Sequence, residues 1–362
     1  MDEQQKFAAF SQALSQEVAC RANEIADDVN TLYIGGGTPS VLPLSVFEHL
    51  LHKLGEYGHG VPYKEFTVEV NPEDIVQKSH SYVEGLLRLG VNRISMGVQS
   101  FDDAILKWMN RRHDSRTARD AYSILEEAGV PNISIDLIFG LSQLSDDQWR
   151  ETLDKALSIS SRGALPHHIS SYQLSVEPGS ALALLVERGQ WSEASEELCS
   201  RQYEILCDRL RQAGYHHYEI SNFAQPGYEA VHNSAYWNHV PYVGLGPGAH
   251  SYIKTVSPSG AEAHVRKWNK SDIVSYTNAA GRDDFSSVTE QEELTRQQLA
   301  LEHVMLGLRT SSGLPEAYLR EHCDAAAIDA ALSSGNIVKL DTGNIRIPES
   351  KFFISDSIIC DL

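Results

Sequence analysis

Three consecutive glycines, Gly35 to Gly37, follow a short apolar segment at residues 31–34, and Thr38 and Pro39 come directly after them. Because glycine has no Cβ, such a run lets the backbone turn sharply and pass close to a ligand. Its bare amides can face a carboxylate or a phosphate. The GxGxxG spacing of a dinucleotide-binding turn is absent, and no Gly-Lys-Ser/Thr of a phosphate-binding loop follows. The run therefore indicates a tight turn, and a binding role for it depends on which other residues lie nearby.

Four polar residues stand near the ends of later apolar segments: Glu69, Gln99, Asp136 and Gln173. A carboxylate suits a cation or a hydroxyl group, and a carboxamide both donates and accepts hydrogen bonds. A single carboxylate at a strand end is readily explained as a cap for a nearby helix. Four polar residues, together with the glycine turn, predict a ligand site if the fold brings them to one place.

Segments of strand length alternate along the first half of the chain with segments of helical period. Strands are expected at 31–34, 66–70, 92–101, 133–141 and 168–174, and helices at 3–27, 44–54, 79–89, 102–109, 115–128 and 146–160. This alternation predicts an α/β fold with a parallel sheet. In such sheets ligands bind at the carboxyl ends of the strands, so the glycine turn and the polar residues would meet at one edge.

The alternation weakens in the second half. A long helix is expected at 192–213, and residues 254–287 read as a variable connection. Helices at 290–307, 315–321 and 325–332 precede a strand pair at 337–340 and 344–347. Helices followed by a small sheet are typical of a winged-helix-like domain, but the acidic residues near position 290 argue against DNA binding by it.

The composition narrows the class of partner. The chain has 49 Asp and Glu against 30 Lys and Arg, a formal net charge of −19, which argues against a nucleic-acid interface and a polybasic membrane anchor. No apolar run has the length of a membrane span. The first residues resemble neither a signal nor a transit peptide, so the expected compartment is the cytoplasm. The five cysteines are scattered without ligand-like spacing and read as reduced thiols.

Ten segments, in order, resemble one known family: GGGTPS (35–40), EVNP (69–72), NRISMGVQSF (92–101), NRRH (110–113), DLIFGL (136–141), SSYQLSVEPGS (170–180), YEISNFA (218–224), HNSAYW (232–237), GLGPGAHS (244–251) and MLGLR (305–309). The set is similar to the radical S-adenosylmethionine (SAM) group that contains oxygen-independent coproporphyrinogen III dehydrogenase and the heme chaperone HemW. The segments at 218–224, 232–237 and 244–251 resemble the HemW branch more closely. The resemblance implies a partial (β/α)6 barrel of TIM type at 1–180, completion of the barrel with a loop region at 181–287, and a C-terminal winged-helix-like extension at 288–362.

The resemblance also implies ligands and the residues that hold them. SAM would be contacted by Gly36, Gly37, Thr38, Glu69, Gln99, Arg111, Asp136, Ser175 and His250. The residue types suit SAM: Glu69 suits a cation or a hydroxyl, Arg111 suits the carboxylate, Asp136 suits the ribose hydroxyls, and Gln99 can donate and accept hydrogen bonds. The heme candidates are His232, His250, Tyr236 and Trp237, because imidazole is a common axial ligand and aromatic rings can line a porphyrin face. Heme and an acceptor hemoprotein are the implied partners.

Members of the group bind a [4Fe–4S] cluster through a CxxxCxxC motif after their first strand. This sequence contains no CxxxCxxC motif and no recognisable strand before residue 31. Three thiolates are needed for such a cluster, so none is expected on this chain. Either the sequence lacks its true N-terminus, which the lack of a whole strand favours, or it is a degenerate member. In the first case an organellar address could be missing as well.

Three functions remain open at this point. The first is a HemW-like chaperone that holds heme and passes it to an acceptor. The second is oxidative decarboxylation of coproporphyrinogen III by a SAM-derived radical, which needs a cluster. The third is a cluster-free scaffold that binds only a partner. The HNxxYW and GLGxGAHS segments favour the chaperone.

Overall fold

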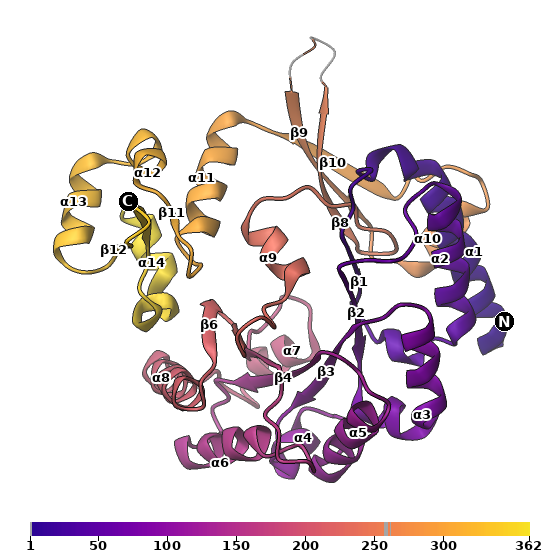
Figure 1. The fold of residues 1–362 in the computed structure, drawn as a ribbon, viewed down its shortest axis with the longest axis horizontal. Helices are drawn as coiled ribbons and strands as arrows, with labels where there is room; N and C mark the ends of the chain where they lie inside the picture. The colour runs from indigo at the N-terminus through magenta and orange to yellow at the C-terminus, as the bar shows by residue number, and fades with distance from the viewer. Residues whose placement is uncertain (1, 257–259, 261) are drawn as a thin grey trace.

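The computed structural model describes residues 2–256, 260 and 262–362. Seven strands form a curved sheet in the order β1-β2-β3-β4-β5-β7-β6 (Figure 1). They are β1 Thr31–Ile34, β2 Glu65–Val70, β3 Arg93–Gln99, β4 Ile133–Phe139, β5 His168–Gln173, β6 His216–Glu219 and β7 Asn222–Ala224. Strands β1 to β5 are parallel, which confirms the expected alternation. The antiparallel pair β6–β7 then joins β5 through β7, a feature that the sequence did not indicate.

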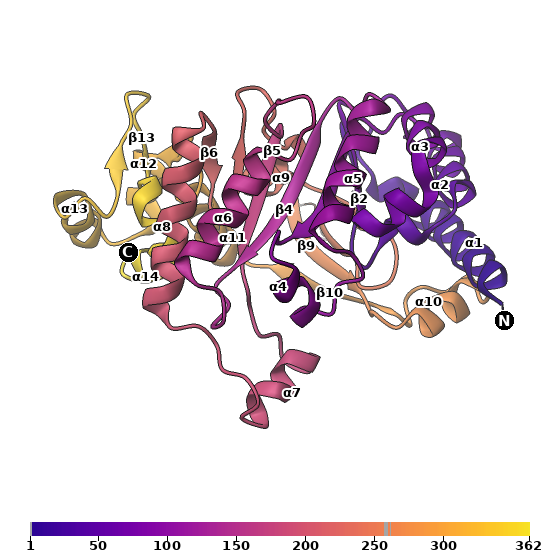
Figure 2. The same ribbon diagram turned by 90° about the horizontal axis from the view of Figure 1, so that it is seen from below.

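The helices of the first half are α1 Glu3–Arg21, α2 Leu44–Glu56, α3 Pro72–Arg88, α4 Asp103–Trp108, α5 Ser115–Glu127, α6 Asp146–Leu157, α7 Ala181–Glu187 and α8 Glu196–Gln212. Helices α3, α5, α6 and α8 cover the convex face of the sheet, and α7 projects from the body (Figures 1 and 2). Among the described residues, no helix is long and apolar enough to span a membrane.

The middle of the chain contains more regular structure than expected. Helix α9 (Val231–Trp237) lies on the concave side of the sheet (Figure 1). Strands β8 (His250–Val256), β9 (Glu262–Asn269) and β10 (Thr289–Leu294) form a second, antiparallel sheet, and α10 spans Ile273–Ala280. The expectation of a variable connection at 254–287 is therefore wrong for the described residues of this segment. Residues 257–259 and 261 lie outside the described residues. The helix expected from residue 290 begins only at Arg296, because residues 289–294 pair with β9.

The end of the chain has the expected helices followed by a small sheet. The helices are α11 Arg296–Gly307, α12 Glu316–His322, α13 Ala325–Ser333 and α14 Ser355–Cys360. The expected strand pair is present as β12 (Val338–Lys339) and β13 (Asn344–Arg346). A further short strand, β11 (Leu314–Pro315), pairs with the other side of β13.

The two faces of the curved sheet differ in polarity, and this difference positions the site. Because side chains alternate along a strand, Val68, Met96 and Ile135 enter the apolar core, where each is fully buried. Between them, polar residues point to the concave side: Glu65, Thr67 and Glu69 on β2, Arg93 and Ser95 on β3, and Ser134 and Asp136 on β4. The concave face is therefore a polar surface, and α9 packs against it at β1.

The N-terminal helix is joined to the second sheet by a buried carboxylate. Glu17 of α1 is fully buried and accepts hydrogen bonds from the Gly246 amide at 2.7 Å, the Asn269 side chain at 2.7 Å and the Tyr276 hydroxyl at 2.6 Å. Arg21, one helical turn later, pairs with Glu17 at 3.1 Å. The GLGPGAHS segment is thus held by α1 through the Gly246 amide and the Gly244 carbonyl, which accepts from Arg21 at 2.7 Å.

Candidate functional site

The glycine turn is fixed by a carboxylate from the neighbouring strand. Glu69 stands at the carboxyl end of β2, and its Oε2 accepts a hydrogen bond from the Gly36 amide at 3.1 Å. Gly36 and Gly37 both have positive φ angles, of 75° and 66°, which residues with a Cβ rarely adopt. The expected turn is therefore present, and it lies against Glu69 as the sequence predicted.

A second set of hydrogen bonds joins the turn to β3. Asn71 donates to the Thr38 hydroxyl at 3.4 Å, and its Oδ1 accepts from Nη2 of Arg111 at 3.1 Å. The same Nη2 donates to the Gly97 carbonyl at 3.2 Å. A Cβ at Gly97 would lie 2.8 Å from Nε2 of Gln99 and 3.3 Å from Nη2 of Arg111, so both side chains pack closely on this glycine. Thr38, Gln99 and Arg111 are therefore brought together around Asn71 and Gly97.

Asp136 completes this group on β4. Its Oδ1 accepts a hydrogen bond from the Ser95 hydroxyl at 3.0 Å. Burial raises the pKa of Asp136 to about 6, and the charge of nearby Glu69 acts in the same direction, while the Ser95 hydroxyl and the charge of Arg93 oppose the rise. Asp136 can therefore change its protonation state near neutral pH. We call Gly36, Gly37, Thr38, Glu69, Gln99, Arg111 and Asp136 the strand-end cluster.

Helix α9 is held next to this cluster by β1 and β2. Its first two amides, those of Val231 and His232, donate to the two carboxylate oxygens of Glu65 at 2.7 and 3.0 Å. These amides have no partner within the helix, and the negative charge suits the helix N-terminus. Nδ1 of His232 lies 2.8 Å from the Thr31 hydroxyl, and Nε2 lies 2.8 Å from the Tyr236 hydroxyl.

Of the four heme candidates, three lie together on α9 and one lies apart. His232, Tyr236 and Trp237 belong to the helix. His250 is exposed at the start of β8, where its ring stacks on Trp268 of β9. No hydrogen bond, ion pair or ring contact of the described residues joins His250 to α9 or to the strand-end cluster.

Gln173 ends β5 as expected, but neither it nor Ser175, an expected SAM contact, forms a described hydrogen bond with the cluster. The Ser175 hydroxyl donates to Glu177 in its own exposed loop at 2.9 Å. Gln173 is exposed and packs on Gly140, at whose position a Cβ would lie 2.9 Å from its Cγ. Among the described residues, the strand-end cluster therefore contains seven of the nine residues expected to contact SAM, and Ser175 and His250 are not joined to it.

Sequence reasoning missed Tyr33 and Glu65. Tyr33 donates a 2.5 Å hydrogen bond to Oε1 of Glu69, and its ring stacks on His232 with centroids 5.0 Å apart. The signal that could have found both is the period of two along a strand: Tyr33 alternates with Leu32 and Ile34, and Glu65 precedes Glu69 by four residues on the same face.

The residues of the strand-end cluster fit SAM by their chemistry. The two oxygens of Glu69 have lone pairs beyond those used by Tyr33 and Gly36, which suits an ammonium group. Among the described residues, the side-chain hydrogen bonds of Arg111 all come from Nη2, so the remaining guanidinium donors can face a carboxylate. Asp136 has an acceptor oxygen beyond the one used by Ser95, which suits a ribose hydroxyl.

The cysteines of the chain do not fit a [4Fe–4S] cluster. Cys20 lies on α1, Cys199 and Cys207 on α8, and Cys323 and Cys360 near the end of the chain. No group of three His, Cys, Asp or Glu residues suited to a metal ion occurs in the part of the chain that the structure describes. We therefore derive no chemistry through a cluster.

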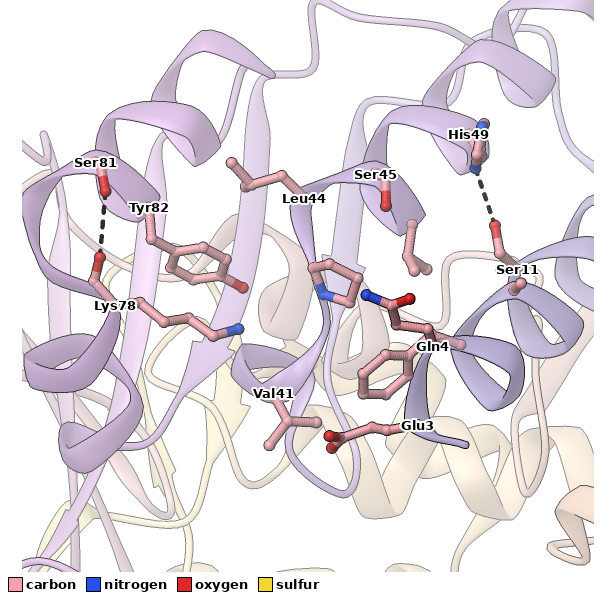
Figure 3. A pocket seen from close by; sticks show the side chains of 14 residues that line it. Glu3, Gln4, Ser11, Val41, Leu44, Ser45, His49, Lys78, Ser81 and Tyr82 are labelled. Atoms are coloured by element: carbon pink, nitrogen blue, oxygen red, sulfur yellow. Dashed lines mark hydrogen bonds between the residues drawn. The ribbon is translucent and has the colours of Figure 1, made fainter. Parts of the chain in front are cut away.

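A groove near the start of the chain lies outside the site. It has a volume of about 860 Å³ and opens between α1, α2 and α3 (Figure 3). Lys78 reaches from α3 across it and donates to the carbonyls of Ser40 and Leu42 at 2.5 and 2.9 Å. These residues follow the glycine turn, so the wall of the groove supports the turn from behind.

The fold and the site define the class of protein, and the known relatives agree. Residues 14–156 match the Radical SAM superfamily. The structure superposes on the coproporphyrinogen III oxidase HemN from Escherichia coli, a radical SAM enzyme, with a TM-score of 0.78. At 20% identity, over 100% of this chain and 84% of the enzyme, that likeness shows the fold. The chain is thus a radical SAM protein in architecture.

Sequence similarity identifies the family within this class. The chain is 33% identical to the heme chaperone HemW of Synechocystis, covering 90% of this chain and 75% of the relative. It is 35% identical to HemW of Lactococcus lactis, covering 80% and 71%. A mitochondrial radical SAM domain-containing protein 1 from Danio rerio is 29% identical, covering 91% and 74%. This chain belongs to the HemW family.

Proposed function

We propose that this protein is a heme chaperone that binds heme at α9 and passes it to an acceptor hemoprotein. The observation that carries the proposal is the placement of His232, which is fixed by Thr31 and Glu65 on the concave side of the sheet. The relatives named heme chaperone HemW support it. The expected compartment is the cytoplasm, while mitochondrial relatives exist in animals.

His232 has the properties that an axial ligand needs. Burial lowers its pKa, so the imidazole is neutral at pH 7 and keeps a lone pair for iron. The Thr31 hydroxyl orients the ring through Nδ1. Nε2 is then the nitrogen available to heme, provided that the Tyr236 hydroxyl gives up its hydrogen bond. Bound heme would supply the redox-active iron, and the chain's own task is to hold it reversibly.

SAM is the second ligand in this proposal, and the strand-end cluster would hold it. Glu69 would bind its ammonium group, Arg111 its carboxylate and Asp136 its ribose. Binding at this position stiffens the glycine turn and the strand ends that face α9. We propose no radical step, because the cysteines of the chain lie on separate elements and do not form a cluster site.

Hemin titration tests the heme part of the proposal. We expect a saturable shift of the Soret band with the intact chain, and its loss in His232→Ala. His216→Ala removes an exposed histidine that pairs with Glu229 and should leave the shift unchanged. Loss of the shift in His250→Ala instead would move the ligand to β8, and an unchanged shift in both site variants would refute the axial assignment.

Transfer is tested with an apo-hemoprotein. Heme-loaded chain is mixed with apomyoglobin as a probe acceptor, and the spectrum of holomyoglobin is followed against free hemin at equal concentration. The proposal predicts transfer at a rate that depends on dissociation from the chain. If the loaded chain does not release heme to apomyoglobin, the transfer part of the proposal is refuted and only heme binding remains.

A further inference from the structure

Tyr33 occupies the position between the strand-end cluster and α9. Its side chain lies on the concave face of β1 and is largely buried. The hydroxyl donates to Oε1 of Glu69 at 2.5 Å, and the ring stacks on His232 at an interplanar angle of 19°. One side chain therefore contacts both the proposed SAM position and the proposed heme position.

The Tyr33 ring packs tightly against Gly35. A Cβ at Gly35 would clash with Cε1 of the Tyr33 ring and would lie 2.7 Å from Oε1 of Glu69. The glycine turn, the tyrosine ring and the carboxylate are therefore packed against one another. A movement of any one of them is passed on to the others, because close-packed groups cannot yield independently.

Two strands extend this packing to α9. On β1, Thr31 bonds Nδ1 of His232, and Tyr33 stacks on the same ring. On β2, Glu65 binds the amides of Val231 and His232, while Glu69 binds Tyr33 and the Gly36 amide. Thr31 and Glu65 thus hold the start of α9. Tyr33 and Glu69, further along the same two strands, hold the glycine turn.

We propose that Tyr33 is a positioning residue that fixes Glu69 and couples the ligand position at Glu69 to α9. The positioning role stands on the geometry alone, and the coupling rests on the proposed function, since it concerns SAM and heme. Burial, with the charge of Glu69, keeps the pKa of the phenol above its usual value. Tyr33 therefore remains a hydrogen-bond donor across the physiological pH range.

The sign of the coupling follows from the shared packing. A ligand at either position restricts the motion of Glu69, Tyr33 and His232. Binding of the second ligand then costs less conformational entropy. Hemin should then tighten SAM binding, by about fivefold or more, and SAM should tighten hemin binding by the same factor.

The positioning role is tested without ligand by amide hydrogen exchange in the full chain. Tyr33→Phe keeps the ring and removes the hydroxyl, so Glu69 loses one of its two anchors and its bond to the Gly36 amide weakens. We expect exchange at Gly36 to accelerate by about threefold or more, as a weakened bond to a charged acceptor predicts. Tyr57→Phe, at an exposed position after α2, is the matched control and should leave Gly36 unchanged. Equal exchange in Tyr33→Phe and the intact chain would overturn the positioning role.

The coupling is tested by calorimetric titration of SAM with and without saturating hemin. In the intact chain we expect the fivefold tightening, and in Tyr33→Phe a weaker affinity and a ratio close to one. A ratio that Tyr33→Phe leaves unchanged would overturn the coupling. An intact chain that binds neither SAM nor hemin would refute the proposed function and the coupling together, while hydrogen exchange would still decide the positioning role. If Tyr33→Phe does not fold, Gly35→Ala, whose Cβ would press on the Tyr33 ring and on the Glu69 carboxylate, is expected to give the same two results.

Discussion

The amide of His232 donates a hydrogen bond of 3.0 Å to Glu65, a buried carboxylate 167 residues earlier in the chain. Through this bond, a residue of the first parallel strands fixes the start of α9. The helix has seven residues, none of them buried, and isolated helices of this length are unstable in water. Its position therefore depends on its contacts with β1 and β2.

Glu65→Gln should destabilise the chain and weaken hemin binding. The glutamine side chain has one acceptor oxygen, so one of the two amides at the start of α9 would face an NH2 group. Leaving one of these part-buried donors without a partner costs on the order of 1 kcal/mol in the free energy of unfolding, measurable by urea denaturation. Glu48→Gln, at an exposed position on α2, should change it by less than about 0.5 kcal/mol. Equal stability of the two variants would contradict this account of α9.

SAM binding should depend on pH through Asp136. Because the pKa of Asp136 in the folded chain is about 6 against a usual 3.8, only about a tenth of it is ionised at pH 5. If the carboxylate accepts a hydrogen bond from the ribose, affinity should rise about tenfold from pH 5 to pH 7 and then level. Titration calorimetry in buffers of different ionisation enthalpy would detect the proton released near pH 6, and Asp136→Asn should abolish both effects.

The raised pKa of Asp136 also predicts how the free energy of unfolding depends on pH. The folded state holds the proton of Asp136 more tightly than the unfolded state, so its contribution to stability is complete below about pH 4 and is lost as the pH rises through about 6. The free energy of unfolding of Asp136→Asn, measured relative to the intact chain, should therefore improve with rising pH over this window. A difference that stays constant from pH 4 to pH 7 would be incompatible with the raised pKa.

Tyr236→Phe should tighten hemin binding. The Tyr236 hydroxyl bonds Nε2 of His232 in the ligand-free chain, so iron must displace it. Its removal spares the cost of one hydrogen bond, about 0.5–1.5 kcal/mol, or about two- to tenfold in affinity. Burial raises the pKa of this tyrosine to about 12, which leaves it neutral at pH 7 and a poor ligand itself. Weaker binding in Tyr236→Phe would instead make the phenol the ligand.

Glu17→Ala should be among the most destabilising single substitutions in the chain. It would remove the acceptor of the Gly246 amide, the Asn269 side chain and the Tyr276 hydroxyl, while Arg21 would keep its second carboxylate partner, Glu24. Leaving a buried donor without a partner costs about 1–3 kcal/mol, and this substitution orphans more than one. Thermal unfolding would measure it, with Glu48→Ala as the exposed counterpart. A loss comparable to that of Glu48→Ala would mean that α1 is held by its apolar contacts alone.

The parallel strands were predictable because each is a short apolar run with a period of two. The sequence also predicted correctly that Glu69 and Gln99 lie at the carboxyl ends of their strands, whereas Asp136 lies in the middle of β4. Arg111 lies in a loop, and only the resemblance to a known family suggested its role. The contact between Tyr33 and His232 was not predictable, because it depends on the position of α9, which no local pattern specifies.

The segment at 289–294 illustrates a tertiary effect that outweighs local preference. Its sequence, TEQEEL, is acidic and favours the start of a helix, yet it forms the edge strand β10. Glu290 accepts a hydrogen bond from the Trp268 indole at 3.2 Å, and Glu292 faces Arg266 at 3.9 Å. Charged side chains also protect an exposed sheet edge from pairing with other molecules, so the composition that misled the prediction suits the strand.

The hydrogen bonds that bury the Glu17 carboxylate have a consequence for the order in which the chain acquires its structure. Glu17 and Tyr276 are 259 residues apart, and ribosomes add about 5–20 residues per second. Helix α1 therefore leaves the ribosome on the order of ten seconds or more before the residues that bury its carboxylate. During that interval the helix carries a charged group on the face that will later be interior, which keeps that face hydrated and delays its collapse onto the wrong partner. The face of α1 that bears Glu17 would then dock late, although it is synthesised long before its partners.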